Sequence, residues 1–164
     1  MLVPEAQTDR TFREYHRAHR QAAGAQGDDA PSFGVPNLDD PYPRCSFPAL
    51  EAAVWVREIS PDRFLPFDMA LFEAFFGRNE DISDPTVLVR LAEQCGLDGR
   101  GLIGALRDGR FREQVVVESQ EAGRLAISAV PAVVLPGRPP IMGAVPFADL
   151  RRAVEAALRG NGAP

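Results

Sequence analysis

The sequence predicts an α/β fold in which helices pack on a small sheet, and the stretch from residue 125 to residue 158 is the main reason. Ala132 to Leu135 is a four-residue apolar run with proline on both sides, which is too short for a helix and typical of a buried strand. Pro136-Gly137 favours a turn, and Ile141-Met142 then returns as a second strand. A helix begins at Pro146. Because the apolar faces of a hairpin and a helix need a partner, this unit predicts the closing part of a sandwich of helices on a sheet.

The second observation is a helical block from Ser46 to Gly109. Serine or aspartate caps, in two cases directly followed by proline, indicate helix starts, and glycines indicate helix ends. These signals predict four helices, which begin after Ser46, Ser60, Asp84 and Asp98. The aromatic stripe from Phe64 to Phe76 is interpreted as core rather than as a cofactor site. We expect the four helices to pack on each other.

A fifth helix is predicted from Phe111 to Gly123, just before the hairpin. The three valines at 115 to 117 would also suit a strand. The residues from Glu118 to Ala122 favour the helix.

The N-terminal part combines one helix with a long loop. Thr8 or Asp9 can cap a helix, whose apolar face we expect to consist of Phe12, Tyr15, Ala18 and Ala22. The loop from Gly24 to Pro43 then crosses the surface. His16 and His19 lie one turn apart, a spacing that could hold a metal. Without a constellation of Cys, Asp or Glu, we interpret them as a solvated helix face and expect no metal site.

Composition limits the classes of function. The chain has 164 residues and 45% hydrophobic content, enough for one core, so we expect a single domain over residues 1–164. Its formal net charge is -5 without a basic run, which argues against nucleic acid and an anionic membrane surface as partners. No apolar stretch approaches the ~20 residues of a membrane span, and the first residues do not resemble a signal peptide. We therefore expect a cytoplasmic protein.

The two cysteines do not form a redox or zinc motif. Cys45 and Cys95 are too far apart in sequence for a Cys-x-x-Cys pair or a zinc ribbon. We interpret each as a free, half-buried thiol rather than a reactive nucleophile, because no nearby His or basic turn would lower its pKa.

Several segments together resemble the DsbA-like thioredoxin family. They are Pro48 to Ala53, Phe67 to Phe76, Asp81 to Pro85, Ala92 to Leu97, Ser128 to Val133 and Gly143 to Pro146. The similarity is closest to the cytosolic, bacterial FrnE-like branch, which is related to kappa-class glutathione transferases and 2-hydroxychromene-2-carboxylate isomerases. It extends over nearly the whole chain, and the order and spacing of the segments carry it.

The resemblance implies a thioredoxin-like fold with a large helical insertion at residues 46–109 and a C-terminal hairpin plus helix at residues 125–159. It also implies that the Val130–Pro131 bond is cis and that these two residues bind substrate. The backbone at residue 130 would pair with an extended peptide or with glutathione as a short added strand. Judged from the residues alone, Pro131 could equally well just block the start of a strand.

The sequence departs from the family in one respect. The family's first strand and the helix that carries Cys-x-x-Cys should precede Met1, and Met1 to Val3 look like the end of its second strand. We therefore expect an N-terminally truncated, incomplete domain without catalytic residues, inactive as an oxidoreductase. A genuinely shortened, non-catalytic relative is the competing explanation. In either case the strand at 132–135 would lack a neighbour, which predicts an unstable chain or a homodimer through the unpaired sheet edge.

Three functional hypotheses follow. The first is a DsbA-type thiol-disulfide oxidoreductase domain that acts on thiol or disulfide proteins. The second is a glutathione-dependent isomerase or transferase in which Val130 holds the glutathione backbone. The third is a non-catalytic binding module that uses the loop from Gly24 to Pro43 and the helical block. The first is favoured over the second, since neither Cys45 nor Cys95 can substitute for the absent pair.

Overall fold

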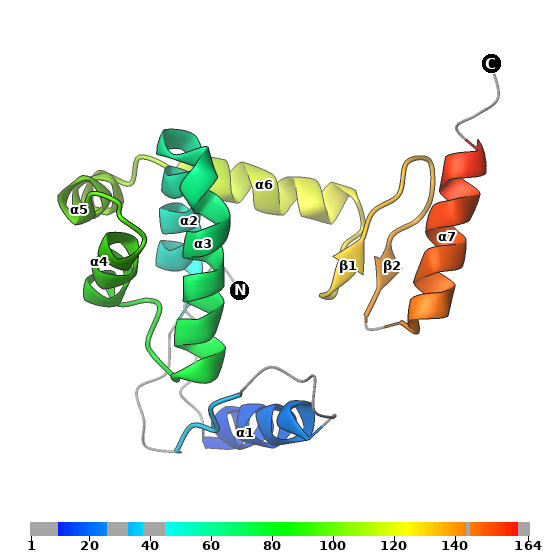
Figure 1. Cartoon of the computed structure of the whole chain (residues 1–164), viewed down its shortest axis with the longest axis horizontal. Helices are drawn as coiled ribbons and strands as arrows, with labels where there is room; N and C mark the ends of the chain where they lie inside the picture. Colours follow the sequence, from blue (N-terminus) through cyan, green and yellow to red (C-terminus); the bar gives the residue numbers. More distant parts are fainter. Residues whose placement is uncertain (1–9, 26–32, 38–44, 144, 161–164) are drawn as a thin grey trace. The chain divides into compact units, whose positions relative to one another are not determined.

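The computed structural model describes residues 10–25, 33–37, 45–143 and 145–160. The chain divides into two compact units, residues 1–115 and residues 116–164 (Figure 1). The helices of the first unit are α1 (Arg10–Gly24), α2 (Phe47–Ile59), α3 (Pro61–Phe72) with the π-helical turn η1 (Glu73–Gly77), α4 (Pro85–Gln94) and α5 (Gly99–Asp108). Helix α6 (Arg112–Arg124) begins in the first unit and continues into the second, which also holds β1 (Ala132–Val133), β2 (Ile141–Met142) and α7 (Phe147–Gly160).

The predicted cap signals explain the start of α4 and both ends of α5. The Asp84 carboxylate accepts the Thr86 amide at the start of α4, and the Asp98 carboxylate accepts the Arg100 amide at the start of α5. Gly109 ends α5 with a φ of 60°, a left-handed conformation that glycine adopts without steric cost. Ser46 precedes α2 as predicted, but its side chain makes no cap hydrogen bond.

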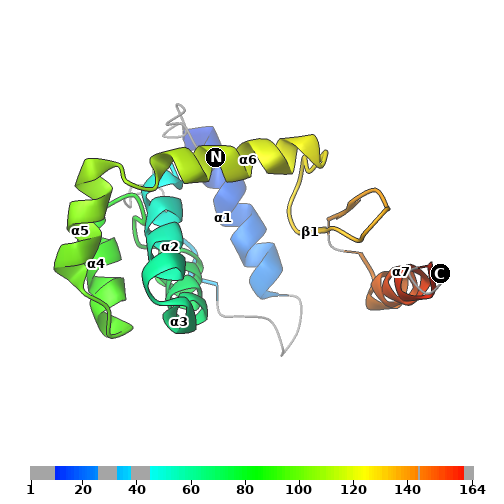
Figure 2. The ribbon, with the colours of Figure 1, turned by 90° about the horizontal axis from the view of Figure 1, so that it is seen from above.

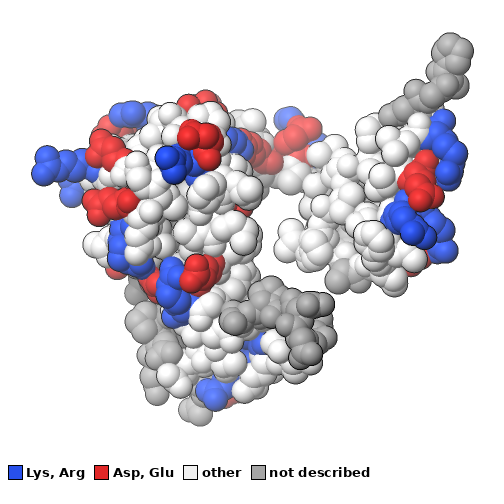
Figure 3. Space-filling view, in the orientation of Figure 1, with Lys and Arg blue, Asp and Glu red and all other residues white. Residues whose placement is uncertain are grey.

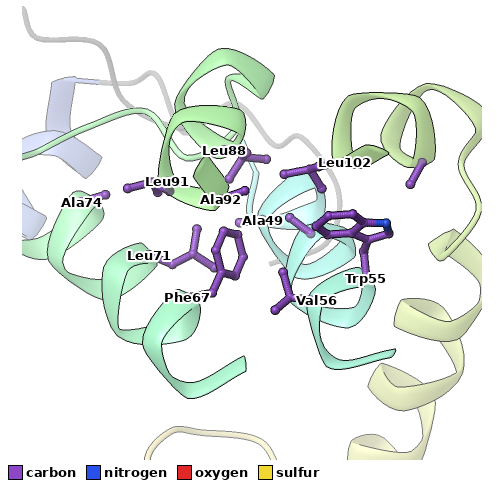
Figure 4. Packing of buried hydrophobic residues seen from close by; sticks show 12 residues of the cluster. Ala49, Trp55, Val56, Phe67, Leu71, Ala74, Leu88, Leu91, Ala92 and Leu102 are labelled. Carbon is purple, nitrogen blue, oxygen red and sulfur yellow. The ribbon is translucent and has the colours of Figure 1, made fainter. Parts of the chain in front are cut away.

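Helices α2 to α5 pack on each other around one hydrophobic core, as predicted (Figure 2). Phe67 and Leu71 of α3 point toward Leu88 and Leu91 of α4, and Trp55 of α2 lies on the other side of the core (Figure 4). Full burial of a Phe or Leu side chain stabilises the folded state by about 1.5–3 kcal/mol. The predicted stripe of Phe64, Phe67, Leu71, Phe75 and Phe76 contributes to this core, since Phe67 and Leu71 are buried and Phe64 packs against them. Phe75 and Phe76 are half-buried.

Helix α6 confirms the helical interpretation of the three valines. Val115 is buried, while Val116 and Val117 are exposed. A helix buries one face, so only one of three consecutive apolar residues enters the core.

The prediction of the apolar face of α1 is wrong. Tyr15, Ala18 and Ala22 are exposed, whereas the buried residue is Arg20, 5% exposed. The Arg20 guanidinium donates to the carbonyls of Gly34 and Phe75 and to the Asn79 side chain. It also lies 4.5 Å from the centre of the Phe75 ring. The predicted caps Thr8 and Asp9, the Phe12 side chain and the strand end at Met1 to Val3 fall outside what the structure describes.

The π-turn η1 explains why an arginine is buried here. A widened turn leaves carbonyls without helical partners, and Arg20 pairs with Phe75 while the Gly34 amide donates to Phe76 at 2.7 Å. A Cβ atom at Gly34 would lie 2.2 Å from the Gly77 carbonyl oxygen, so the backbones approach too closely for any other residue. The described part of the long loop is therefore held against η1.

The C-terminal unit contains the predicted hairpin with shorter strands. β1 and β2 pair antiparallel, with Ala132 opposite Met142 and Val133 opposite Ile141. The strand predicted from Ala132 to Leu135 ends at Val133. Leu135 is the next position whose backbone would face β2, and it stands opposite Pro139, which has no amide to donate. Within the described residues the sheet has these two strands, so the content of the fold is mostly helical.

The turn of the hairpin follows its sequence. The Arg138 amide donates to the Leu135 carbonyl, and Gly137 has a φ of 66°, as a type II turn with proline at its second position requires. Helix α7 begins at Phe147, one residue after the predicted start. Of residues 116–143 and 145–160, only Ala157 is fully buried.

Glu51 is a second buried charged residue that the sequence did not reveal. It lies on α2, 3% exposed, and its Oε1 atom has no hydrogen-bond partner among the described residues. Its Oε2 atom lies 3.6 Å from a guanidinium nitrogen of the exposed Arg112. Burial raises the pKa of the Glu51 carboxyl, and the positive charge of Arg112 only partly opposes this shift.

We predict that Arg20→Lys destabilises the first unit by about 1–3 kcal/mol, because the shorter lysine does not place its nitrogen where Nη1 donates to all three acceptors, and an ammonium group lacks the planar face that lies over the Phe75 ring. Arg20→Met leaves these acceptors unpaired and should cost more. Urea unfolding followed by circular dichroism measures both changes, with Arg17→Lys on the same helix as control. Equal stability of Arg20→Lys and the control would contradict this role.

We also predict that stability falls as pH rises through the titration of Glu51. The folded state binds this proton more tightly than the unfolded state, so its stabilisation is full below the ordinary glutamate pKa and is lost as pH rises through the raised pKa. Glu51→Gln should remove this slope and raise the free energy of unfolding at pH 7 by about 1 kcal/mol. Urea unfolding from pH 4 to pH 8 tests this, with exposed Glu58→Gln as control. An unchanged slope in Glu51→Gln would refute it.

Candidate functional site

The two residues predicted to bind substrate lie where the chain enters β1. The Val130–Pro131 peptide bond is cis, the geometry that the family resemblance implies. Val130 is 87% exposed, and Pro131 is exposed as well. Both residues are therefore accessible at the start of the first strand.

A hydrogen bond beside Pro131 determines the direction of the backbone groups along β1. The Gly143 amide donates to the Pro131 carbonyl at 2.8 Å, which makes residues 131 and 143 a hydrogen-bonded pair. In an antiparallel ladder such pairs alternate with non-hydrogen-bonded pairs. Ala132, opposite Met142, is then a non-hydrogen-bonded position, and its amide and carbonyl point away from β2. We call this side of the strand the open edge of β1.

The other side of the hairpin is protected by proline. Pro139 and Pro140 directly precede β2, and Pro146 follows it closely. Proline cannot donate to an added strand and is one of the usual ways of blocking an edge. Within the residues that the structure describes, no further strand pairs with β1. The open edge of β1 is thus the side of this sheet that can accept an extended partner.

Contacts across the hairpin hold the loop before Pro131. The Ser128 hydroxyl donates to the Met142 sulfur at 3.2 Å, and the Ser128 amide lies 3.4 Å from the same atom. Met142 stands opposite Ala132, so these contacts connect the loop to β2. Ala126 has a φ of 56° where the chain leaves α6.

The surface around the open edge carries almost no charge. Residues 125–148 contain a single charged residue, Arg138, which lies in the turn of the hairpin. The charged side chains of α7 form a red and blue strip in Figure 3, whereas much of the surface beside it is white. Glu118, Glu121 and Arg124 of the second unit lie on α6. Val130, Val134 and Met142 are all exposed there. Such a surface suits a partner held by backbone hydrogen bonds and apolar contacts rather than by ion pairs.

Cys95 lacks the environment of a redox nucleophile. Cys95 is half-buried at the C-terminal end of α4, where the helix dipole disfavours a thiolate. Burial raises the pKa of the Cys95 thiol, and Arg63 opposes the shift only in part. Cys45 is also half-buried and free. The predicted assignment of both residues as free thiols is confirmed.

The histidines of α1 do not assemble a metal site. The Nδ1 atom of exposed His19 lies 2.8 Å from the Tyr15 carbonyl, and its ring lies against the Tyr15 ring. Burial lowers the pKa of His16, and the charge of Arg20 lowers it further. In the described parts of the chain, no three His, Cys, Asp or Glu side chains are grouped so that they could hold a metal ion. In the same parts, no helix combines the length and apolarity that crossing a membrane requires.

Ala132 is the residue of the site that sequence reasoning missed. Its contribution is a backbone amide and carbonyl, which no side-chain pattern indicates. Only the register, fixed by the pair of Pro131 and Gly143, shows which residue of the strand presents these groups at the open edge.

Comparisons with known proteins agree with the predicted fold. Residues 49–155 match the family described as "DSBA-like thioredoxin domain", a match that begins in α2, includes the hairpin and ends in α7. The crystal structure of a "putative protein disulfide isomerase" from Nitrosomonas europaea matches with a TM-score of 0.77 at 22% identity, covering 93% of this chain and 76% of that chain. At this identity the likeness concerns the fold alone. No curated protein matches the chain.

We predict that Cys95 reacts slowly with iodoacetamide and that its reaction rate rises only at a pH above that of free cysteine, whose pKa is about 8.5. The variant Cys45→Ser isolates Cys95, and free cysteine under the same conditions is the control. Burial and the C-terminal helix end both disfavour the reactive thiolate. A rate that rises below the pH of free cysteine would contradict this assignment.

Proposed function

Because the chain belongs to the DSBA-like thioredoxin domain family, we propose that it binds extended thiol or disulfide substrates along the open edge of β1 and serves thiol-disulfide exchange. The observation that carries this proposal is the outward direction of the Ala132 amide and carbonyl, directly after the exposed Val130–Pro131 pair. An extended peptide could add there as a third strand. Glutathione, which has a peptide backbone and a thiol, is the smallest substrate of this chemistry.

The proposal assigns the binding role to backbone groups and to Val130 and Pro131. A peptide that pairs with Ala132 would gain two hydrogen bonds and lie across the exposed Val130 side chain. The uncharged surface around the edge favours apolar side chains in the substrate over charged ones. Selectivity for a particular sequence would be low, since backbone pairing does not depend on the side chains.

The exchange step requires a thiolate that attacks a disulfide sulfur and displaces a second thiolate. The sequence as given contains no Cys-x-x-Cys, and the properties of Cys95 argue against a substitute. We therefore propose that residues 1–164 supply substrate binding and lack exchange activity by themselves. In this proposal the chain is a truncated member of the FrnE-like branch. The first strand of the complete domain would itself pair along the open edge of β1, so peptide pairing at Ala132 is proposed for residues 1–164 by themselves, and the redox pair is encoded upstream of Met1. Sequencing that region tests the last point directly.

Binding should depend on the Ala132 amide. We predict that Ala132→Pro weakens binding of an unstructured peptide with one S-methylated cysteine by at least about fivefold, because proline removes one edge hydrogen bond worth roughly 1 kcal/mol. Ala132→Ser keeps the amide and is the matched control. Isothermal titration calorimetry measures both variants and the wild type, each at low protein concentration.

The ligand has a matched control as well. The same peptide with N-methylated amides cannot pair as a strand and should bind no better to the wild type than to Ala132→Pro. Equal binding by Ala132→Pro and Ala132→Ser would refute the proposed site. Binding of glutathione but of no peptide would instead favour the glutathione-dependent isomerase or transferase.

A further inference from the structure

We propose that the first turn of α6, residues 112–115, is held on α2 in a proton-dependent way. The turn stays docked while the Glu51 carboxyl carries a proton, and it is released when Glu51 ionises. The effect is local, because it concerns one helical turn and not the unfolding of the whole unit. Glu51 and Arg112 both belong to the first unit, so the effect is independent of the proposed substrate site in the second unit.

The first step is the position of Glu51 on an aromatic face of α2. Phe47 precedes it by one turn and Trp55 follows it by one turn, so both aromatic residues share its face of the helix. Trp55 is buried and Phe47 is half-buried. The Glu51 side chain itself is only 4% exposed, so little water reaches the carboxyl while the turn is docked.

The second step is the lack of hydrogen-bond donors for this carboxyl. Oε1 has no hydrogen-bond partner among the described residues, and Oε2 lies 3.6 Å from a guanidinium nitrogen of Arg112. An ionised carboxylate accepts hydrogen bonds at both oxygens, and a buried oxygen without a donor costs free energy. Glu51 can therefore stay buried as a neutral acid, or it can ionise and gain access to water.

The third step is the balance of charges around Glu51. Among the described residues, Arg112 is the one charged group that acts on the carboxyl, and its side chain is 63% exposed, so water weakens the attraction. No charged residue of α3 or α4, which also pack on α2, acts on it. The charged residues of α2, of the end of α5 and of the start of α6 that do not act on it are Arg57, Glu58, Arg107, Asp108 and Glu113. Burial therefore outweighs the ion pair and raises the pKa of docked Glu51.

The fourth step is the small number of polar contacts that hold the turn. Arg112 is the first residue of α6, and its guanidinium lies beside Glu51 and 5.7 Å from the centre of the Phe47 ring. The Gln114 side chain donates to the Glu58 carboxylate at 3.4 Å. A turn held by contacts of this kind opens locally at a small cost in free energy. A change in the charge of Glu51 is then enough to shift the balance between the docked and the released turn.

Release of the turn reverses the situation at Glu51. Once Arg112 leaves α2, water reaches both carboxylate oxygens, and the pKa of Glu51 returns to that of an ordinary glutamate. The docked state thus binds the proton more tightly than the released state. Docking is strongest below the ordinary glutamate pKa and weakens as pH rises through the raised pKa.

The position of this turn in the chain gives the proton its effect. The boundary between the two units lies directly after Val115, inside α6. The first turn is therefore the part of α6 that attaches the helix to the first unit. Protonation of Glu51 would strengthen this attachment, and ionisation would loosen it.

The test is amide hydrogen exchange of the full chain between about pH 4 and pH 8, corrected for the intrinsic rate at each pH. The Val115 amide donates to the Phe111 carbonyl, and this bond should break on release because a helical turn without tertiary support frays. Its protection should fall at least about threefold with rising pH in the wild type and stay constant in Glu51→Gln, whose side chain is neutral at every pH.

The matched control is Glu113→Gln, an exposed substitution in the same turn, which should behave like the wild type. A fall in protection that persists in Glu51→Gln would overturn the proposal. Constant protection in the wild type would overturn it as well.

Urea separates release of the turn from unfolding of the whole unit. Release exposes little surface, so exchange at Val115 should be independent of urea between about 0 and 1 M, whereas exchange at the core residues Leu88 and Leu91 should accelerate. Exchange at Val115 that accelerates as strongly as core exchange would overturn the proposal.

Arg112→Met provides a second variant that does not alter the buried carboxyl. Methionine keeps an unbranched side chain beside the Phe47 ring but removes the positive charge. Ionised Glu51 is then less stable, so the midpoint of the fall in Val115 protection should move to a higher pH. If Arg112 acted only by packing, Arg112→Met would lower protection at every pH without moving the midpoint, and this result would overturn the proposal.

Discussion

The hydrogen bond from the Gly143 amide to the Pro131 carbonyl is the interaction on which the account of the second unit depends. It makes residues 131 and 143 a bonded pair, so the backbone groups of Ala132 point outward and those of Val133 point toward β2. A shift by one residue would reverse these directions and turn Ala132 inward. Register, rather than any side chain, therefore decides where an extended partner can bind.

The first unit is stabilised by different interactions. Its core comes from apolar faces of four helices, two of which, α4 and α5, begin at aspartate caps. At η1, where helical hydrogen bonding is interrupted, the Arg20 guanidinium and the Gly34 amide satisfy the carbonyls of Phe75 and Phe76. Buried polar backbone groups need partners, and here a distant helix and a loop supply them. The loop is thus fixed at one point, although its sequence looks like a simple connector.

The predictable parts of the fold are those that local chemistry decides. Asp84 and Asp98 mark helix starts, and Pro136-Gly137 marks the turn, because each acts within a few residues of chain. The burial of Arg20 and Glu51 was not predictable, since their surroundings are backbone carbonyls and helices distant in sequence. The shortening of β1 was available in principle, because Pro139 and Pro140 stand opposite its expected end. Predicting this shortening required the pairing register of the two strands, which the sequence alone does not reveal.

The candidate site also has a part that the sequence predicts and a part that only the structure shows. Val130 and Pro131 could be identified from a family resemblance, whereas the outward direction of Ala132 follows only from the structure. The most direct test of the open edge compares two neighbouring amides during titration of the labelled chain with the S-methylated cysteine peptide. The account predicts that hydrogen exchange slows at least about tenfold at Ala132 and is unchanged at Val133. Peptide binding that leaves the Ala132 amide unchanged would contradict it.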